Sequence, residues 1–539
     1  MVGIRLVSLI WLLSLSATVD ADEGLLRQII DREVQAGWEQ NQLTATARSS
    51  DAEFLRRVSL DLIGTIPTHA EAVAFLDDPS PDKRGHLIDR LMADPRFARH
   101  QADLWDLILF TRNPPGSEAN RRDGIQLWLT RQFADNVPYD QWVLELLKAE
   151  GNSVEHGPPL YFVQYRSRPE DASESISQTF LGIQLQCARC HDHPFEPWTQ
   201  LDFYGMAAFL ARLQVVSVGK EKDLTKYAIG EKSTGDILFT GPAIEQVAGK
   251  KGEPVKPKFL LGDALAEVEM PKDFKEPKFE DNKPPPPPAS SRKDQLAAWI
   301  ATPENRFFAR AIANRLWAQY LGRGLVHPVD NMSNANPPSH PRLLDELTRQ
   351  LIEHQFDLKW FVRELANSET YQLSSVGGAA ESMPRWFDYG RTRPLSAEEL
   401  ADAWKVATWH DFVQKQGSGE ESKNRFHPLT RDYMIRFFGT PNSGAGDFQG
   451  GLQEHLYLNN GQLGSLVGER KENLTHHLIT SPDPVEARIE RLYLSTLSRR
   501  PMPEETERLR SFVEGTDGQR RWSDVVWALL TCSEFRFNH

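Results

Sequence analysis

Cysteine is scarce in this sequence, with only three among 539 residues. So few cysteines exclude a small scaffold held together by several disulfides. Beyond its first residues the sequence also lacks an apolar run of about 20 residues, the length that a transmembrane helix requires. We therefore expect no membrane-spanning segment in the remainder of the chain.

Basic residues are fewer than acidic residues. The chain has 62 Lys and Arg against 75 Asp and Glu, and its formal net charge is −13. This balance disfavours nonspecific binding to nucleic acid or anionic lipid, because both are bound through basic surfaces. The negative net charge would favour docking to a basic redox partner protein, although most acidic proteins use their charge for solubility. The apolar fraction of 40% is that of a globular protein, and the length favours about two to four domains.

The first 21 residues have the pattern of a secretory signal peptide. Arg5 supplies a positive charge, residues 6–15 form a short apolar run, and small residues follow. Val19-Asp20-Ala21 is a suitable cleavage site and Leu15-Ser16-Ala17 is a second one. The alternative is an N-terminal membrane anchor, but the run is too short to span about 30 Å of hydrocarbon. We expect a signal peptide at 1–21 and a periplasmic or secreted mature protein without a transmembrane segment.

Most of the remaining chain has the apolar periodicity of amphipathic helices and few alternating β-branched runs. Thr68 followed by Glu71 is a typical N-terminal helix cap. Helices are predicted from residue 68 and over 23–38, 51–62, 82–93, 171–186, 291–300, 306–320, 341–356 and 358–367. The expected fold is mainly α, with two helical domains built from helical hairpins.

One type of helix ending occurs three times. Residues 91–97, 365–371 and 529–535 each close an amphipathic helix and place an aromatic residue shortly after a leucine. The lead-in at 62–71 is also echoed at 497–505. We interpret this as a helical-hairpin unit used near both ends of the chain, although such endings are also common in unrelated helices.

Composition changes in the middle of the chain. Residues 214–290 are rich in Lys, Gly and Pro, and apolar pieces at 237–239 and 258–261 are predicted as strands of a small sheet. The prolines at 284–288 favour an extended polyproline segment, which would space two helical parts or bind a recognition domain. The predicted organisation is an N-terminal helical domain over 22–213, a β-containing insertion with a Pro-rich linker over 214–290, and a C-terminal helical domain over 291–539.

The chemistry of the sequence is concentrated in Cys187-Ala188-Arg189-Cys190-His191. Cys-x-x-Cys-His is the attachment signature of c-type haem: two thiols form thioethers with the porphyrin, and the adjoining histidine ligates iron. We expect Cys187 and Cys190 to anchor haem c, with His191 as the proximal ligand. The alternatives are a disulfide between Cys187 and Cys190, a zinc site that adds His191 and His193, and a structural pair without a ligand.

The sequence does not single out a sixth iron ligand. The candidates are Met206, Met332, Met434, His327, His340 and His455. His193 lies too close to His191 in the chain to reach the opposite face of the same ring. A filled sixth position favours electron transfer, whereas an open one favours small-molecule binding or catalysis.

Functional side chains are dense directly after the motif, over residues 192–198. Asp192, His193 and Glu196 could act as acid–base groups or could orient His191. The alternative is a rigid turn, built by two prolines and two aromatic residues, with the polar groups at its surface.

Residues 180–200 (FLGIQLQCARCHDHPFEPWTQ) strongly resemble the planctomycete cytochrome-like domain of unknown function, second type, and residues 56–67 resemble the opening of that family. Residues 313–317, 322–330, 336–341 and 533–539 are similar to the planctomycete domain that regularly follows it. The resemblance covers nearly the whole mature chain, and neither family has an established biochemical function. Many members carry an additional cytochrome c domain with its own motif, but residues 22–180 contain no cysteine. A multihaem relay is therefore not expected, and Cys532 is interpreted as structural.

The leading hypothesis is an exported single-haem protein that transfers electrons. The alternative is a non-redox scaffold or binding protein, in which the cluster from Cys187 to His193 is a structural metal site or a disulfide. A third hypothesis is a hydrolase that uses Asp192, His193 and Glu196 beside residues 336–341. The sequence contains neither a nucleophile elbow nor a metalloprotease motif to support it.

Overall fold

The computed structural model describes residues 25–116, 122–166, 168–221, 224–239, 252–267, 270–280, 282–378, 382–409, 431, 435, 438–439, 456–459, 463–515 and 518–539. The predicted signal peptide and two candidate iron ligands, Met434 and His455, lie outside these ranges.

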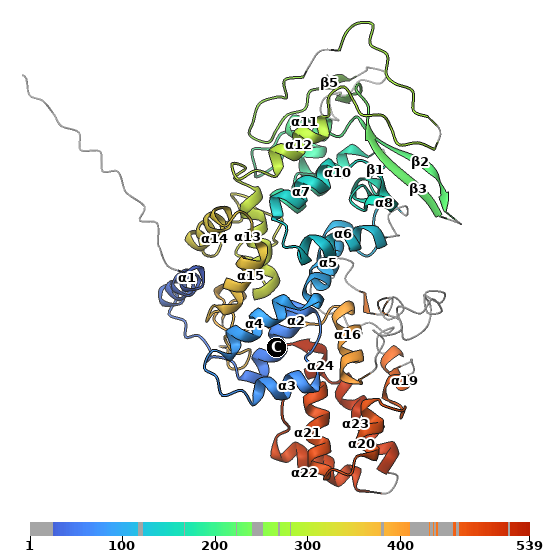
Figure 1. Ribbon diagram of the computed structural model, residues 1–539. Coiled ribbons are helices and arrows are strands. Elements are labelled where there is room, and N and C mark those ends of the chain that lie inside the picture. Colours follow the sequence, from blue (N-terminus) through green and yellow to red (C-terminus); the bar gives the residue numbers. More distant parts are fainter. Residues whose placement is uncertain are drawn as a thin grey trace, which may run out of the picture.

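Helices form most of one elongated body (Figure 1). Its first part contains α1 (Leu26–Gln40), α2 (Asp51–Ile63), α3 (His69–Leu76), α4 (Lys83–Ala93), α5 (Pro95–Phe110), α6 (Asp123–Ala134), α7 (Tyr139–Lys148), α8 (Ser153–His156), α9 (Leu160–Val163), α10 (Pro169–Ile176) and α11 (Gln200–Ala208). Its second part contains α12 (Arg292–Ile300), α13 (Phe308–Leu321), α14 (Pro341–Glu353), α15 (Leu358–Asn367), α16 (Ala397–Ala407), α19 (Leu463–Val467), α20 (Leu474–Thr480), α21 (Val485–Thr496), α22 (Pro503–Val513), α23 (Gly518–Thr531) and α24 (Ser533–Arg536). The prediction of a mainly α fold is confirmed.

Local capping signals start several helices where the sequence predicted them. The Thr68 hydroxyl accepts the N–H of Glu71, and the Glu71 carboxylate accepts the N–H of Thr68, so α3 begins with the expected capping box. Ser50 caps α2 and Ser291 caps α12. Gly64 ends α2 with φ 68, a conformation that a residue with a Cβ adopts only with strain.

The helical unit predicted near both ends of the chain corresponds to α2–α5 and α21–α24. In each unit, the glutamate that caps the second helix also binds an arginine. Arg96 lies 2.8 Å from Glu71, and Arg499 lies 2.7 Å from Glu505. Helices α3 and α21 contact each other, so the two units are neighbours although they stand at opposite ends of the sequence (Figure 1).

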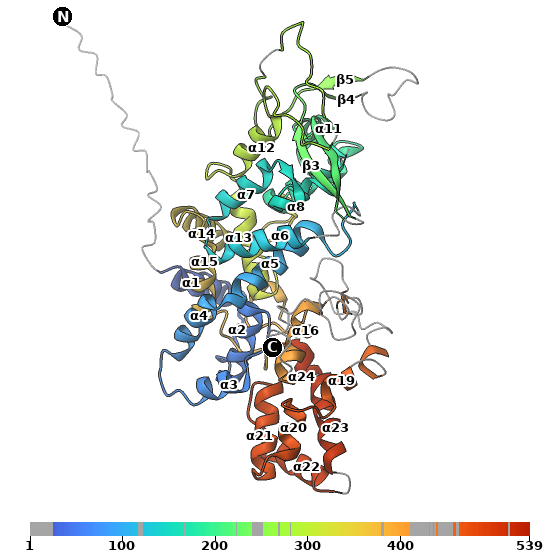
Figure 2. The same cartoon turned by 45° about the vertical axis from the view of Figure 1, so that its right-hand side comes forward.

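Strands are few and short. β1 (Gly151–Asn152), β3 (Leu224–Glu231) and β2 (Leu213–Glu221) form an antiparallel sheet in the order β1-β3-β2, beside α8 and α9 (Figure 2). β4 (Ile237–Phe239) pairs with β5 (Glu253–Val255), which confirms the strand predicted at 237–239. β6 (Arg393–Pro394) pairs with β7 (Phe537–Asn538).

The strand predicted at 258–261 is wrong. Lys258 forms only an isolated bridge with Ala264. The chain turns back on itself there, since Leu261 has φ 57 and the N–H of Gly262 binds the carbonyl of Phe259. This tight turn ends the extended run before a ladder can form.

The proline run at 284–288 has no regular secondary structure and lies against the sheet. A Cβ added to Gly230 of β3 would come within 2.4 Å of the Pro285 ring, so only a glycine leaves room for this contact. After the run, the N–H of Ala289 binds the Ser233 hydroxyl and Ser291 binds Glu231. Pro285 therefore packs on β3, and hydrogen bonds tie the residues after the run to the sheet, while the role of the run as a linker stays a prediction.

Two hydrophobic cores organise the described residues. The larger includes side chains from α1 to α11 together with α12 to α15, on both sides of the predicted division near residue 290. The smaller core consists of side chains from α16 and α19 to α24, together with Leu60 and Ile66 from the N-terminal part. The boundaries at 213 and 290 stay predictions.

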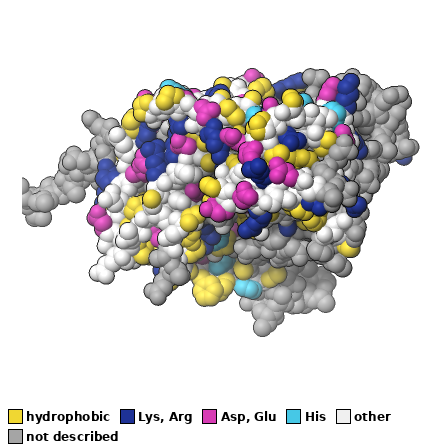
Figure 3. Space-filling model, turned by 90° about the horizontal axis from the view of Figure 1, so that it is seen from below, with side chains coloured by type: hydrophobic (Ala, Val, Ile, Leu, Met, Phe, Trp, Pro, Cys, Tyr) yellow, Lys and Arg dark blue, Asp and Glu magenta, His cyan; other side chains and the backbone are white. Residues whose placement is uncertain are grey.

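Charges are mixed on the end of the molecule that Figure 3 shows, where acidic and basic side chains alternate. Ion pairs of exposed residues occur on the helices at this end, such as Arg500 with Asp77 and Glu490, and Arg510 with Glu486. The net negative charge therefore does not produce a single acidic face here.

Candidate functional site

The segment leading to Cys187 is an interrupted helix. α10 passes into a π-helical turn, η2 (Ser177–Leu181), which ends at Gly182 with φ 68. Residues 183–185 follow without regular structure, and the motif begins in the 3₁₀ helix η3 (Gln186–Arg189). The prediction of one helix over 171–186 is therefore wrong at its C-terminal end, because the left-handed Gly182 terminates the helix.

Both thiols and the imidazole of the motif are accessible. Cys187 and Cys190 are exposed free cysteines, and His191 is exposed as well. The structure thus holds the two cysteines as free thiols and not as a disulfide. Within the part of the chain that is described, no group of three or more His, Cys, Asp and Glu side chains is arranged to hold a metal ion. The zinc alternative stays a prediction.

His191 has a defined tautomer. Its Nδ1 lies 2.8 Å from the carbonyl oxygen of Asp192. A carbonyl oxygen can only accept, so Nδ1 carries the proton and donates it. The neutral ring then has an unprotonated Nε2, and this is the atom through which such an imidazole can ligate a metal.

His193 has the opposite arrangement. Its Nδ1 accepts the backbone N–H groups of Phe195 and Glu196, at 3.3 and 3.1 Å. The proton of a neutral His193 ring must therefore be on Nε2, and the ring is occupied in shaping the turn. Asp192 has a similar structural role, because its Oδ1 accepts the N–H of Gln200 at the start of α11. These contacts favour the rigid-turn interpretation of residues 192–198.

Glu196 joins the motif loop to a second loop, residues 322–340. Its Oε1 accepts the backbone N–H of Asn334 at 2.8 Å, and its Oε2 accepts the Asn334 side-chain amide at 3.4 Å. Gln184 adds a hydrogen bond of 3.1 Å to Asp330 in the same loop. The motif loop therefore contacts the second loop at Asp330 and Asn334, just before the residues 336–341 that the hydrolase hypothesis names. Asp192, His193 and Glu196 each form hydrogen bonds within these loops, and the hydrolase hypothesis stays a prediction.

Met332, one of the candidate sixth ligands, lies in the loop that Glu196 and Gln184 contact. Its N–H binds the carbonyl of Gly182 at 2.9 Å, and its side chain packs on that glycine. His327 lies on the same loop and is exposed at the surface, where partial desolvation of its ring and the charges of Arg323 and Arg391 lower its pKa.

The other two described candidates lie within the protein. Met206 is fully buried in the larger core. His340 is buried against Gly37 of α1 and between Trp386 and Phe387. Both side chains are enclosed by packing, and their roles as iron ligands stay predictions. Their burial follows from packing that joins distant parts of the chain.

Gly182 offers a local test of this arrangement. We expect Gly182→Ala to lower the free energy of unfolding by about 1–2 kcal/mol, because a Cβ is strained at positive φ. The added Cβ would also approach the Met332 side chain to 3.2 Å. Urea unfolding checks this, with Gly464→Ala as the control, since a Cβ at Gly464 meets no atom within 4 Å. Equal urea midpoints for the two variants would contradict the role given to Gly182.

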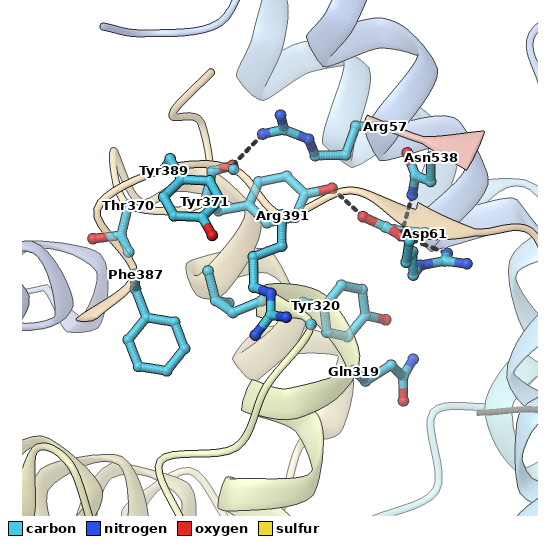
Figure 4. A pocket seen from close by; sticks show the side chains of 14 residues that line it. Arg57, Asp61, Gln319, Tyr320, Thr370, Tyr371, Phe387, Tyr389, Arg391 and Asn538 are labelled. Carbon is cyan, nitrogen blue, oxygen red and sulfur yellow. Dashed lines mark hydrogen bonds and ion pairs between the residues drawn. The ribbon is translucent and has the colours of Figure 1, made fainter. Parts of the chain in front are cut away.

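A second polar site surrounds a small cavity between α2, the end of α13 and the chain's last strand (Figure 4). The cavity has a volume of about 20 Å³, roughly the space of one water molecule. It is far too small for a porphyrin. Its lining includes Arg57, Asp61, Tyr371, Arg391, Arg393 and Asn538.

Asp61 is the centre of this site. Its carboxylate accepts hydrogen bonds from the Tyr371 hydroxyl, the Arg393 guanidinium and the Asn538 amide, each at 2.8 Å. Arg393 also binds both oxygens of Glu399 at 2.8 Å. Burial raises the pKa of Asp61, and the charge of Arg393 opposes that shift. Burial would also raise the pKa of Glu399, but Arg393 outweighs it and lowers this pKa to about 2.

Sequence analysis missed this polar site. Asp61 offered one available signal, since it stands among Val58, Leu60 and Leu62 in a helix that is buried on all sides. No local pattern indicates its partners, which come from segments 310 to 477 positions away.

The comparisons with known proteins identify two domains. A family model described as PSCyt2, a protein of unknown function (DUF1549), matches residues 29–215. A second, described as PSD1, a protein of unknown function (DUF1553), matches residues 292–433. The chain therefore carries a PSCyt2 match followed by a PSD1 match, in the order that its motifs predicted. Residues 533–539, which were also assigned to the second domain, lie outside both matches.

The remaining comparisons add no relative of known function. No curated protein and no solved structure matched the chain. The name of the first domain refers to a cytochrome, but neither description states an activity. In the described part of the chain, no helix has the length and apolar character to cross a membrane.

Proposed function

We propose that this protein is an exported, single-haem, c-type cytochrome-like protein that transfers electrons. The observation that carries the proposal is the state of the motif: Cys187 and Cys190 are exposed free thiols, and the Nδ1 of the adjacent His191 donates to Asp192. Two accessible thiols are what thioether formation requires, and the free Nε2 is what iron ligation requires.

The motif residues supply the two thiols and the imidazole that this group needs. Cys187 and Cys190 would hold the haem, and His191 would be the proximal ligand. A haem so held supplies one-electron chemistry, whose potential depends on the axial ligands and on exposure. The chain's own contribution is to orient His191 through the Asp192 carbonyl and to brace the loop through Glu196 and Asn334.

The decisive experiment is maturation of the full chain with its own N-terminus, in a host that expresses a cytochrome c maturation system. We expect a Soret band that stays with the polypeptide under denaturing conditions, at about one haem per chain. Cys187→Ser combined with Cys190→Ser should abolish covalent haem. Cys532→Ser is the matched control and should retain it, because Cys532 is a half-buried thiol at the start of α24. A folded wild-type protein without haem would refute the proposal.

The alternative function is a non-redox scaffold or binding protein. Phe195 in the loop after the motif favours it, because this large apolar side chain is 78% exposed, as in a surface that contacts a partner. Metal analysis and thiol titration of the purified protein distinguish this alternative. Two titratable thiols at Cys187 and Cys190 after maturation, without bound metal, would support it.

A further inference from the structure

Arginine residues without acidic partners gather at the end of α13. Arg323 and Arg391 form no hydrogen bond or ion pair with any residue that the structure describes, and the Nε of Arg323 is buried without a partner. Arg385 only stacks on the Trp386 ring, 5.0 Å from its centroid. In a chain with net charge −13, such a group of unneutralised cations requires an explanation.

These charges act on one another. Burial lowers the pKa of Arg323, and the charges of Arg391 and Arg385 lower it further. Arg323 and Arg391 also lower the pKa of His327, after burial. Arg323 is therefore close enough to Arg391 and to Arg385 for their charges to act on it. The fold holds them there through the turn after α13, where Gly322 packs on the Arg391 side chain.

Arg391 also lines the cavity beside the Asp61 site. Of the three guanidinium groups in that lining, Arg393 is neutralised by Asp61 and Glu399, and Arg57 binds Glu53. Arg391 forms no ion pair with an acid among the residues that the structure describes, and in Figure 4 its side chain points in among the lining residues. An unpaired, half-buried cation at the mouth of a cavity attracts an anion.

We propose that Arg323 and Arg391, with Arg385 beside them, bind the oxyanion or carboxylate group of a small ligand on the surface next to this cavity. The cavity itself has room for only about one water molecule, and of the three arginines only Arg391 lines it. A guanidinium group presents two parallel N–H donors that match two oxygens of such a group. The anion would neutralise the mutual repulsion of the arginines. This site is separate from the haem proposal, because it uses none of the motif residues.

Direct binding to the full chain tests the proposal. Sulfate, phosphate and acetate are titrated by calorimetry and by thermal unfolding, with ionic strength held constant by NaCl. At least one of the three should bind saturably and raise the Tm by a few degrees, since a ligand of the native state stabilises it. Arg391→Gln and Arg323→Gln should each weaken that binding by about ten-fold or more.

The control is Arg500→Gln, which removes the same charge from an arginine paired with Asp77 and Glu490 elsewhere. It should bind the anion like the wild type. Arg391→Lys keeps the charge without the paired donors and should show intermediate affinity.

Arg391→Gln removes the repulsion between residue 391 and Arg323. The Tm of this variant without ligand should therefore be equal to or above that of the wild type. A lower ligand-free Tm with unchanged anion binding would overturn the proposal, since Arg391 would then only stabilise the C-terminal end of α13. Absence of saturable binding by all three anions would overturn it as well.

Discussion

Arg393→Met is expected to lower the free energy of unfolding by about 3–5 kcal/mol at neutral pH, because it leaves buried carboxylates without their cation. The Asp61 and Glu399 side chains are only 5% and 2% exposed, and Arg393 lies 2.8 Å from each. Removing one member of a buried ionic group costs far more than the net value of the interaction, since the remaining charges stay desolvated. Urea unfolding at pH 7 measures the loss.

The pH dependence of this variant gives an independent check. In the wild type, Arg393 lowers the pKa of Glu399 from 4.5 to about 2, so this stabilisation is present above pH 4.5 and is lost as the pH falls toward 2. In Arg393→Met, burial acts alone and raises the carboxyl pKa values above those of the unfolded chain. The deficit of the variant should therefore be largest near neutral pH and shrink as the carboxylates take up protons in acid.

Two comparisons isolate the cause. Arg500→Met removes an exposed ion pair and should cost no more than about 1 kcal/mol. Adding Glu399→Gln to Arg393→Met should recover part of the loss, because one unpaired charge disappears. If Arg393→Met destabilised the protein no more than Arg500→Met does, the Asp61 site would not hold the chain together as described.

A second large effect is expected from His340 in mildly acidic solution. Burial lowers the pKa of His340 from 6.5 to about 4. Between these values the unfolded chain binds a proton that the native state does not, so stability falls as the pH is lowered from 6.5 to 4. The shift corresponds to a loss of roughly 3 kcal/mol over that interval. Below pH 4 the native ring is protonated as well, and this contribution stops changing.

His340→Gln should remove that part of the pH dependence. The ring is enclosed by Gly37, Trp386 and Phe387, and its Nδ1 contacts the Ser339 hydroxyl. Its Nε2 has no partner among the described residues. Urea midpoints measured from pH 4 to 7 should therefore have a shallower slope in His340→Gln than in the wild type. His86→Gln, on the exposed surface of α4, serves as the control; a slope that is the same in all three proteins would contradict the assignment.

Much of the helical structure could be predicted because it depends on neighbours in the chain. The helix predicted at 358–367 is observed as Leu358–Asn367, and the capping box of α3 links residues only three positions apart. The two wrong elements, 171–186 and 258–261, were each ended by a backbone conformation with positive φ, at Gly182 and Leu261. Apolar periodicity carries no information about such a break.

By itself, the sequence determined the helical class, the two families and the position of the thiol motif, because helix periodicity, caps and contiguous motifs are local properties. Only the tertiary structure decided which distant groups meet. It placed Met332 against Gly182, buried His340, joined Asp61 to Asn538 across 477 positions and placed Arg391 beside the cavity. The state of a polar side chain depends on the charges and solvent around it after folding, and chain order does not specify those surroundings.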